Sequence, residues 1–101
     1  MNAQPGISDY ALSFINAPQA WNLTQGDDSV VIAISDQNFE VVHQDLEGKY
    51  IHYDAGNTAP TTHGTAVAIT AAGKTNNGYG LSSIGFNTSL ALYKMNFNEI
   101  L

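Results

Sequence analysis

The stretch Ser29-Val30-Val31-Ile32-Ala33-Ile34-Ser35-Asp36 decides the fold of this chain. Its interior is a run of β-branched and small apolar residues, without the alternation of apolar and polar positions that a half-exposed strand shows. Such a run, preceded by Gly26-Asp27-Asp28 and followed by polar residues, predicts a parallel strand buried on both faces. Asp36 ends this strand at the carboxyl edge of the sheet, where open α/β sheets form their ligand crevices.

The segments on either side of this strand complete an α/β pattern. Pro18 suits the first turn of a short helix that ends before Gly26. Aromatic and β-branched residues predict a second strand, and a run of small apolar residues predicts a buried helix that ends at Gly73. The second strand, the buried helix and a third strand are expected at residues 49–54, 63–72 and 89–95.

Composition sets the size and the surface character of the fold. The chain has 101 residues, of which 44% are hydrophobic, so it can bury one modest core. Only 12% are charged, and the surface must therefore be polar mainly through neutral hydrogen-bonding groups. We expect one compact unit, with residues 1–14 forming a peripheral arm.

Charge and apolar content exclude several functions. Nine acidic residues against three basic ones give a net charge of -6, which repels the phosphates of nucleic acid. The scarcity of Lys and Arg argues against a polybasic membrane contact, and no apolar run approaches the roughly 20 residues of a spanning helix. The chain has no cysteine, which removes disulfides, thiolate metal sites and cysteine nucleophiles. A soluble protein without nucleic-acid or membrane partners is expected.

Asp36 and His63 form a candidate acid–histidine pair. The first ends a predicted strand and the second begins a predicted helix, so both side chains face one crevice. A buried carboxylate that accepts the proton-bearing nitrogen of an imidazole fixes its tautomer and stabilises the imidazolium that forms in proton transfer. From spacing alone, an ordinary helix cap and a loop histidine remain an open alternative.

Several stretches, which follow one another in the same order as in the family, resemble the amino-terminal part of the subtilisin-like serine proteases. His63-Gly64-Thr65-Ala66-Val67-Ala68 is similar to the family's His-Gly-Thr-His-Val-Ala motif. The other matching stretches are Ile15–Trp21, Val31–Asp36, His43–Leu46 and, further on, Gly80–Met95. The resemblance implies a parallel-sheet, three-layer α/β fold of which this chain is the first portion only, with residues 15–101 as the amino-terminal part of a catalytic domain.

Peptide-bond hydrolysis is the activity that the resemblance implies. Asp36 would orient His63, and His63 would act as general base and then general acid for a serine, which makes these two the candidate catalytic residues. The family's serine lies in a Gly-Thr-Ser-Met-Ala stretch further along, and that serine-bearing part is absent here. Asn87-Thr88-Ser89-Leu90-Ala91 imitates that stretch but falls at a strand entry, so the chain alone is expected to be inactive.

Three residues depart from the family pattern. Asn38 stands where the family has a glycine, and asparagine tolerates the left-handed backbone that such a turn can need. Ala66 replaces the histidine of the family motif, and Ile69 replaces a usual glycine. We expect the helix that carries them to pack differently against its neighbours.

No cofactor is expected to be required, but one structural calcium site is implied by the resemblance. Asp45 and Asn77, with the backbone carbonyls of Tyr79 and Leu81, would supply the oxygen ligands that this hard cation takes. A solvated carboxylate and ordinary turn residues remain the alternative. His43 and His52 lack a matched third ligand and are assigned structural roles.

Two other functions stay open beside the endopeptidase. One is an inactive subtilase-like binding module that uses the crevice or an exposed sheet edge, which the missing nucleophile and Ala66 favour. The other is a metal-dependent hydrolase that uses Asp36, His63 and Asp45. An incomplete α/β half should expose apolar sheet and helix surface, so self-association or pairing is expected. For the parent, the resemblance implies a polypeptide substrate and a secreted or cell-envelope location.

Overall fold

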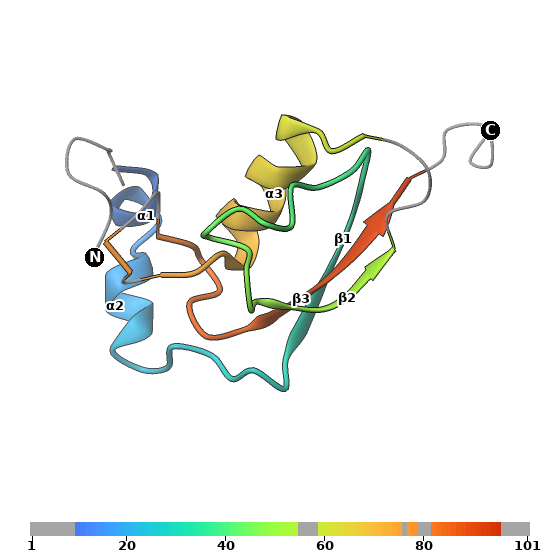
Figure 1. Ribbon diagram of the computed structural model, residues 1–101. Coiled ribbons are helices and arrows are strands. Elements are labelled where there is room, and N and C mark those ends of the chain that lie inside the picture. Colours follow the sequence, from blue (N-terminus) through green and yellow to red (C-terminus); the bar gives the residue numbers. More distant parts are fainter. Residues whose placement is uncertain (1–9, 55–58, 76, 79–81, 96–101) are drawn as a thin grey trace.

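The computed structural model of the chain describes residues 10–54, 59–75, 77–78 and 82–95 (Figure 1). The predicted α/β class is confirmed, and each predicted strand and helix is present. In chain order the elements are α1 (Tyr10–Phe14), α2 (Ala17–Trp21), β1 (Val31–Asp36), β2 (Tyr50–Asp54), α3 (Thr62–Ala72) and β3 (Ser89–Lys94).

The three strands form one parallel sheet in the order β1-β3-β2. β3 is the central strand, which agrees with its four consecutive buried residues at the amino-terminal end. The register pairs Val31 with Ser89 and Asp36 with Lys94. All three strands therefore end at the same edge of the sheet, and the chain after β1 leaves the sheet at that edge.

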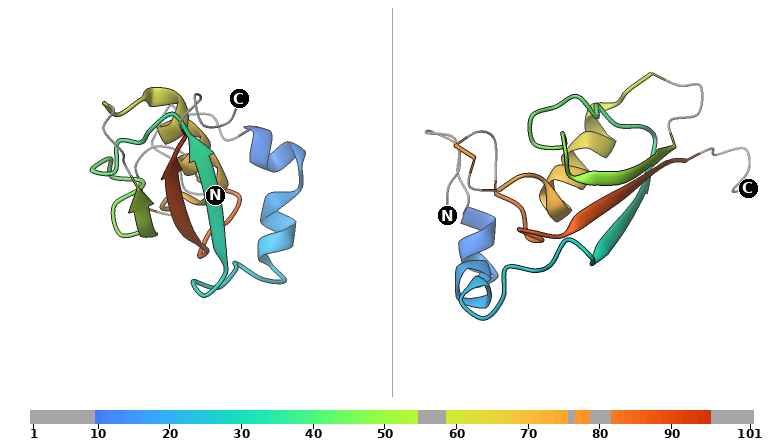
Figure 2. Two further views of the ribbon diagram at one scale, coloured as in Figure 1. Left: turned by 90° about the vertical axis from the view of Figure 1, so that its right-hand side faces the viewer. Right: turned by 60° about the horizontal axis from the view of Figure 1, so that its bottom comes forward.

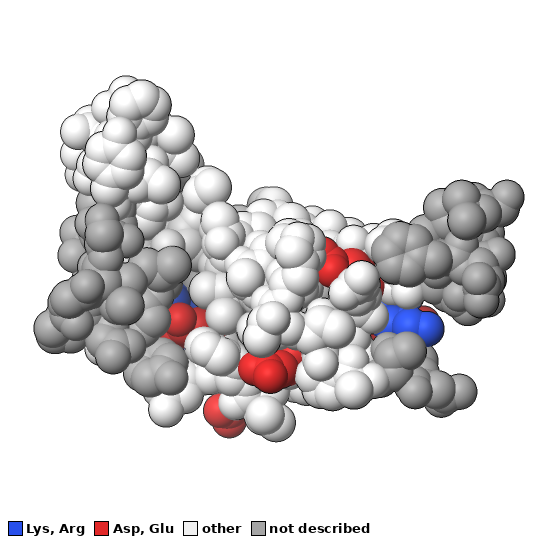
Figure 3. Space-filling model, turned by 90° about the horizontal axis from the view of Figure 1, so that it is seen from above, with Lys and Arg blue, Asp and Glu red and all other residues white. Residues whose placement is uncertain are grey.

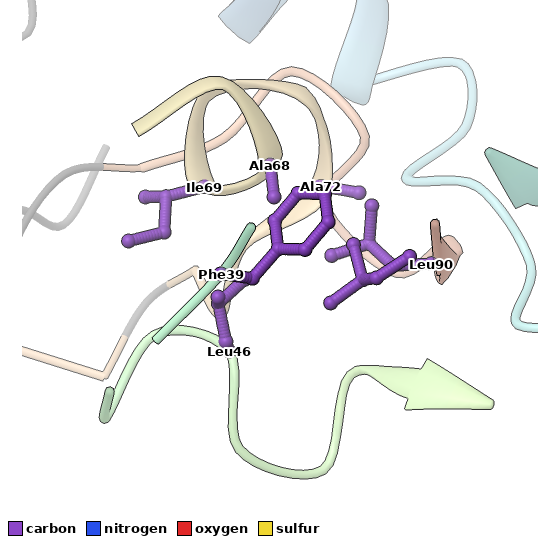
Figure 4. Close-up of a cluster of buried hydrophobic side chains, with 7 residues drawn as sticks. Phe39, Leu46, Ala68, Ile69, Ala72 and Leu90 are labelled. Atoms are coloured by element: carbon purple, nitrogen blue, oxygen red, sulfur yellow. The ribbon is translucent and has the colours of Figure 1, made fainter. Parts of the chain in front are cut away.

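A single helix, α3, covers one face of the sheet (Figures 1 and 2). Small residues on its inner side let it approach the strands closely. Figure 4 shows Phe39 beneath the helix, between α3 and the strands. The fully or nearly fully buried members of this core are Phe39, Leu46, Ala68, Ile69, Ala72, Leu90 and Leu92.

The prediction that the first strand is buried on both faces is wrong for the described residues. Val31, Ala33 and Ser35 are exposed, while Ile32 and Ile34 are half-buried against the core. The reason is that α3 is the one described helix that contacts the strands, and it lies on one face. Of the three layers that the resemblance implies, the described residues form the sheet and a helix layer on one side.

An irregularity in β2 turns two tyrosines to the same face. The pairing with β3 shifts register between Tyr50 and His52, and Ile51 is exposed there. Successive side chains of a regular strand point to opposite faces, so Tyr50 and Tyr53 would otherwise diverge. With the shift, both pack against the core.

The two amino-terminal helices pack on each other, away from the sheet. Asn16 separates them in the left-handed conformation, with φ at 60°, and Pro18 occupies the first turn of α2. Trp21 fixes α2 to the loop before β3: its Nε1 donates to the carbonyl of Ile84 at 3.2 Å, and its ring meets Phe86 edge-on. Helix α1 lies within residues 1–14, which were predicted to form a peripheral arm.

The surface above α3 is mostly uncharged, with acidic side chains in small separate groups (Figure 3). This distribution matches a chain with few charged residues. Within the residues that the structure describes, no helix is long and apolar enough to cross a bilayer.

Candidate active site

The structure brings Asp36 and His63 together. Nδ1 of His63 lies 2.9 Å from Oδ2 and 3.1 Å from Oδ1 of the carboxylate. Oδ1 also accepts the backbone N–H of Gln37 at 2.7 Å. Because an ionised carboxylate only accepts hydrogen bonds, the neutral imidazole in this contact carries its proton on Nδ1.

Close approach of two backbones creates this contact. Gly64 lies against the loop that follows β1: a Cβ at this position would overlap the carbonyl oxygen of Asn38 and lie 3.3 Å from Cβ of Asp36. Only glycine lets the first turn of α3 come so near to the end of β1. The neighbouring His63 is thereby placed over the Asp36 carboxylate.

The two partners differ sharply in exposure. The His63 side chain is 74% exposed, whereas that of Asp36 is 11% exposed. Within the described residues, no partner is recorded for Nε2 of His63. A buried acid that orients an accessible imidazole is the arrangement in which the free ring nitrogen takes a proton from an incoming group and returns it.

Ser89 is remote from this pair. The register places it at the amino-terminal end of β3, five positions from the residue that pairs with Asp36, or about 16 Å along the strand. Its side chain is buried, and its hydroxyl donates to the carbonyl of Asp28 at 2.7 Å. These contacts give Ser89 a structural role.

Asp45 and Asn77 also meet, at a different place in the fold. Nδ2 of Asn77 donates to Oδ1 of Asp45 at 2.9 Å. Asp45 is 1% exposed, and its other oxygen, Oδ2, is buried without a hydrogen-bond partner among the described residues. An orphaned carboxylate oxygen is costly to bury, so the donor chemistry here fits a hard cation. Tyr79 and Leu81, whose carbonyls the prediction also used, lie outside the described residues.

The remaining histidines do not build a metal centre. His43 accepts the backbone N–H of Asp45 through Nδ1, and the His52 ring stacks on Tyr93 with centroids 5.0 Å apart. The described part of the chain contains no group of three His, Cys, Asp or Glu side chains that could hold a metal ion. The metal-dependent hydrolase, which needs Asp36, His63 and Asp45 in one site, has no support in this geometry.

Comparison with known families decides the membership of this chain. Residues 27–100 match the sequence model described as "Subtilase family". The chain belongs to the subtilase family. The matched region contains β1 with Asp36, the whole of α3 with His63, and β3.

Of three curated relatives of this subtilase chain, two are serine proteases by name. It is 36% identical over 96 residues to halolysin from Haloferax mediterranei, a match that covers 83% of this chain and 18% of halolysin. It is 34% identical over 77 residues to the thermophilic serine proteinase of Bacillus sp. strain AK1, covering 70% and 19%. It is 37% identical over 89 residues to the halolysin-like extracellular serine protease Nep of Natrialba magadii, covering 74% and 16%. The chain therefore spans less than a fifth of these relatives.

The three departures from the subtilase pattern lie in different environments. The backbone of Asn38 is not in the left-handed region. The ability of asparagine to adopt that conformation therefore does not explain this residue. Ile69 fills the core beneath α3 beside Phe39. Ala66 lies exposed on the outer side of the helix, in an open apolar depression that begins at His63 and includes Val67.

Sequence reasoning missed a buried hydrogen-bond network behind the pair. Asn38 is fully buried, and its Oδ1 accepts the hydroxyl of Tyr53 at 2.8 Å. Burial and the neighbouring Tyr50 raise the pKa of the Tyr53 hydroxyl above its usual value, which keeps it protonated as a donor. The signal available in the sequence was an asparagine at a position where the family has glycine.

Lys49 supplies a second polar contact beneath the sheet. Its ammonium group donates to the carbonyl of Phe86 at 3.1 Å. Burial lowers the pKa of Lys49, because the charged form loses part of its hydration. This contact ties the residue before β2 to the loop before β3.

Proposed function

We propose that this subtilase chain supplies the acid and histidine of a peptide-bond hydrolase whose serine lies outside the chain. The observation that carries this proposal is the 2.9 Å contact between Nδ1 of His63 and the buried carboxylate of Asp36. The serine-protease names of two of the relatives support it.

In this function the pair moves one proton twice. Nε2 of His63 takes the proton of the serine hydroxyl as the oxygen attacks the scissile carbonyl, and then gives it to the leaving amine. Asp36 accepts the Nδ1 proton throughout and stabilises the transient imidazolium. We infer that the chain alone does not perform this reaction, because Ser89, which imitates the family's serine motif, is buried at the far end of β3.

A chimaera tests this assignment. The corresponding segment of halolysin from Haloferax mediterranei is replaced by this chain, and hydrolysis of a polypeptide substrate and labelling by a fluorophosphonate are measured. Asp36→Asn should lower kcat on the order of 10⁴-fold and His63→Ala on the order of 10⁶-fold, about the losses known for the same positions of subtilisin itself.

Matched variants separate catalysis from folding. Glu47→Gln and His52→Ala change an exposed carboxylate and an exposed imidazole elsewhere, and should leave the rate within about twofold. A folded, active chimaera whose rate is unaffected by Asp36→Asn and His63→Ala would overturn the assignment. Labelling of the isolated 101-residue chain by the fluorophosphonate would also contradict it.

We propose further that Asp45 and Asn77 contribute to a structural calcium site. The Asp45 carboxylate would offset one of the two charges of the cation and supply the oxygen that lacks a partner among the described residues, and the Asn77 amide oxygen would be a second ligand. The ion would hold the loop after β1 to the loop after α3, stabilising the fold without taking part in the reaction.

Thermal unfolding with and without calcium tests this site. Addition of millimolar CaCl₂ to chelator-treated protein should raise the Tm, and Asp45→Asn should abolish the increase. Asp28→Asn, at an exposed carboxylate, is the control and should show the same increase in Tm as the unchanged chain. An equal calcium response in both variants would place the binding elsewhere.

The uncovered surfaces of the sheet support self-association or pairing with another chain. Val31 is exposed on the face opposite α3, and the outer edge of β1 has no strand beside it among the described residues. Such a face and edge favour association. Light scattering should give a mass above that of one chain, and a monomer at tens of micromolar would refute this.

A catalytically inactive binding module is the second candidate function, and the exposed Ala66 at the family's histidine position favours it. The chimaera distinguishes the two, since a module would restore folding without hydrolysis.

The word extracellular in the name of the Natrialba magadii relative supports a secreted or cell-envelope location for the parent. Fractionation of producing cells, followed by immunodetection of the chain, tests that location.

A further inference from the structure

Asn38 occupies the junction between the two halves of the candidate site. It follows Asp36 by two residues and is 0% exposed. Its Oδ1 accepts two hydrogen bonds, from the backbone N–H of Phe39 and from the hydroxyl of Tyr53, both at 2.8 Å. The side chain thus ties the loop after β1 to β2.

The backbone of Asn38 makes the connection to α3. Its carbonyl oxygen accepts the hydroxyl of Thr61, the N-cap residue of α3, at 2.9 Å. The same carbonyl is the group that a Cβ on Gly64 would strike. A second link runs beside it, since the Thr65 hydroxyl accepts the N–H of Glu40 at 2.8 Å. The first turn of α3 is therefore bonded to the loop on both sides of Gly64.

The irregularity in β2 is what brings Tyr53 into this network. The register shift after Tyr50 directs Tyr53 to the α3 side of the sheet, where its hydroxyl reaches Asn38. Its ring meets Phe39 edge-on, with centroids 6.3 Å apart. Packing and hydrogen bonding together hold the hydroxyl in place.

We propose that Asn38, clamped by Tyr53 and Thr61, is a positioning residue that sets the distance between Asp36 and His63. Asp36 is joined covalently to the loop, and His63 to the helix, so their separation depends on how the loop is held against the helix. In a chain with the family's glycine at this position, the side-chain clamp would be missing. The functional meaning of this clamp rests on the proposed role of the pair in proton transfer.

The tautomer of His63 reports this distance directly. A carboxylate within hydrogen-bond distance of Nδ1 favours the proton on that nitrogen, and loss of the contact releases the ring toward the mixture that free imidazole adopts. The tautomer ratio is read from ring nitrogen chemical shifts in the histidine-labelled 101-residue chain, at about pH 9, where free imidazole is neutral.

Two substitutions each remove one hydroxyl group from the network. Tyr53→Phe deletes the hydroxyl that reaches Asn38, and Thr61→Val deletes the hydroxyl that reaches its carbonyl. Each should lower the ratio of Nδ1–H to Nε2–H at His63 by about 2- to 10-fold, the change that one net hydrogen bond produces in an equilibrium. Thr61→Ser keeps the hydroxyl and should restore the ratio.

A matched control and a double variant sharpen the test. Tyr50→Phe removes a hydroxyl from the same strand and the same core, keeps the bond between Tyr53 and Asn38, and should leave the ratio unchanged. Asn38→Gly should reproduce the effect of Tyr53→Phe, and the double variant should shift the ratio no further than Asn38→Gly alone, because both changes remove the same bond.

An unchanged ratio in folded Tyr53→Phe and Thr61→Val would overturn the proposal, as would an equal shift in Tyr50→Phe. If Tyr53→Phe does not fold, the Thr61→Val and Thr61→Ser pair decides. Unfolding of both Tyr53→Phe and Thr61→Val would also overturn it, because the network would then support the whole fold. The measurement requires no proteolysis, so an inactive chimaera would affect the proposed function and leave this inference standing.

Discussion

The backbones of Gly64 and Asn38 are in contact. Any side chain at Gly64 would overlap the carbonyl oxygen of Asn38. This contact joins the first turn of α3 to the end of β1. His63 precedes Gly64 by one residue and Asp36 precedes Asn38 by two, so this contact determines how close their side chains lie. The hydrogen-bonding geometry of the pair is thus a consequence of a steric requirement at a neighbouring residue.

Gly64→Ala should destabilise the fold by about 1–3 kcal/mol, because the added methyl group must displace backbone atoms. An open helix position would instead gain roughly 1 kcal/mol from the same change. Urea unfolding measures the difference. Gly78→Ala is the comparison: that residue has φ at 71° and nothing within 4 Å of an added Cβ, so it should lose about 1–2 kcal/mol through backbone strain alone. Stabilisation by Gly64→Ala would contradict the contact.

Ser89→Ala tests the structural assignment of the serine that imitates a nucleophile motif. Loss of its 2.7 Å bond to the carbonyl of Asp28 should lower the free energy of unfolding by about 0.5–1.5 kcal/mol. Ser35→Ala, at an exposed serine of β1, should change it by less than about 0.5 kcal/mol. Recovery of a fluorophosphonate adduct on Ser89 would contradict this assignment.

The secondary structure and its order were predictable because they depend on local pattern. The β-branched run before Asp36 has few alternatives to a strand, and the small-residue run from His63 to Ala72 suits a helix that lies close to a sheet. The crevice between Asp36 and His63 followed from topology, since the end of a strand and the start of the crossover helix meet at the same edge.

The remaining features depend on contacts between distant segments. Burial of β1 on both faces was predicted from its unbroken apolar run, but such a run does not say which elements cover each face of the strand. The bond between Asn38 and Tyr53 requires a register shift in β2 that the weak alternation of residues 49–54 does not specify. Helix α1 is five residues long with exposed Tyr10 and Phe14, too short and too exposed for periodicity to reveal.

Leu92→Ala should destabilise the protein by about 2–5 kcal/mol, because Leu92 is fully buried in the core beneath α3 and its removal leaves a cavity. Chemical denaturation followed by circular dichroism measures the loss. Val42→Ala, at a residue exposed on the loop after β1, should cost less than about 0.5 kcal/mol. Equal effects of the two substitutions would mean that the core is not packed as the structure shows.

Alkaline pH should weaken the fold through Tyr53. Unfolded, this tyrosine releases its proton near its ordinary pKa of 10.0, whereas burial and Tyr50 raise the pKa in the folded state. Between these two values the unfolded chain binds fewer protons, so stability is complete below the lower pKa and is lost as the pH rises through the higher one. Burial lowers the pKa of Lys49, so the contribution of Lys49 to the free energy of unfolding increases as the pH rises.

Comparison with Tyr53→Phe isolates the tyrosine, because the Lys49 contribution is the same in both proteins and cancels in the difference. Urea midpoints measured from about pH 8 to about pH 11 should converge for the two proteins as the pH rises, since the wild type loses at high pH the bond that the variant never makes. Val42→Ala, at an exposed residue without a titratable group, should run parallel to the wild type. A constant gap between wild type and Tyr53→Phe would show that the hydroxyl bonded to Asn38 does not titrate with folding.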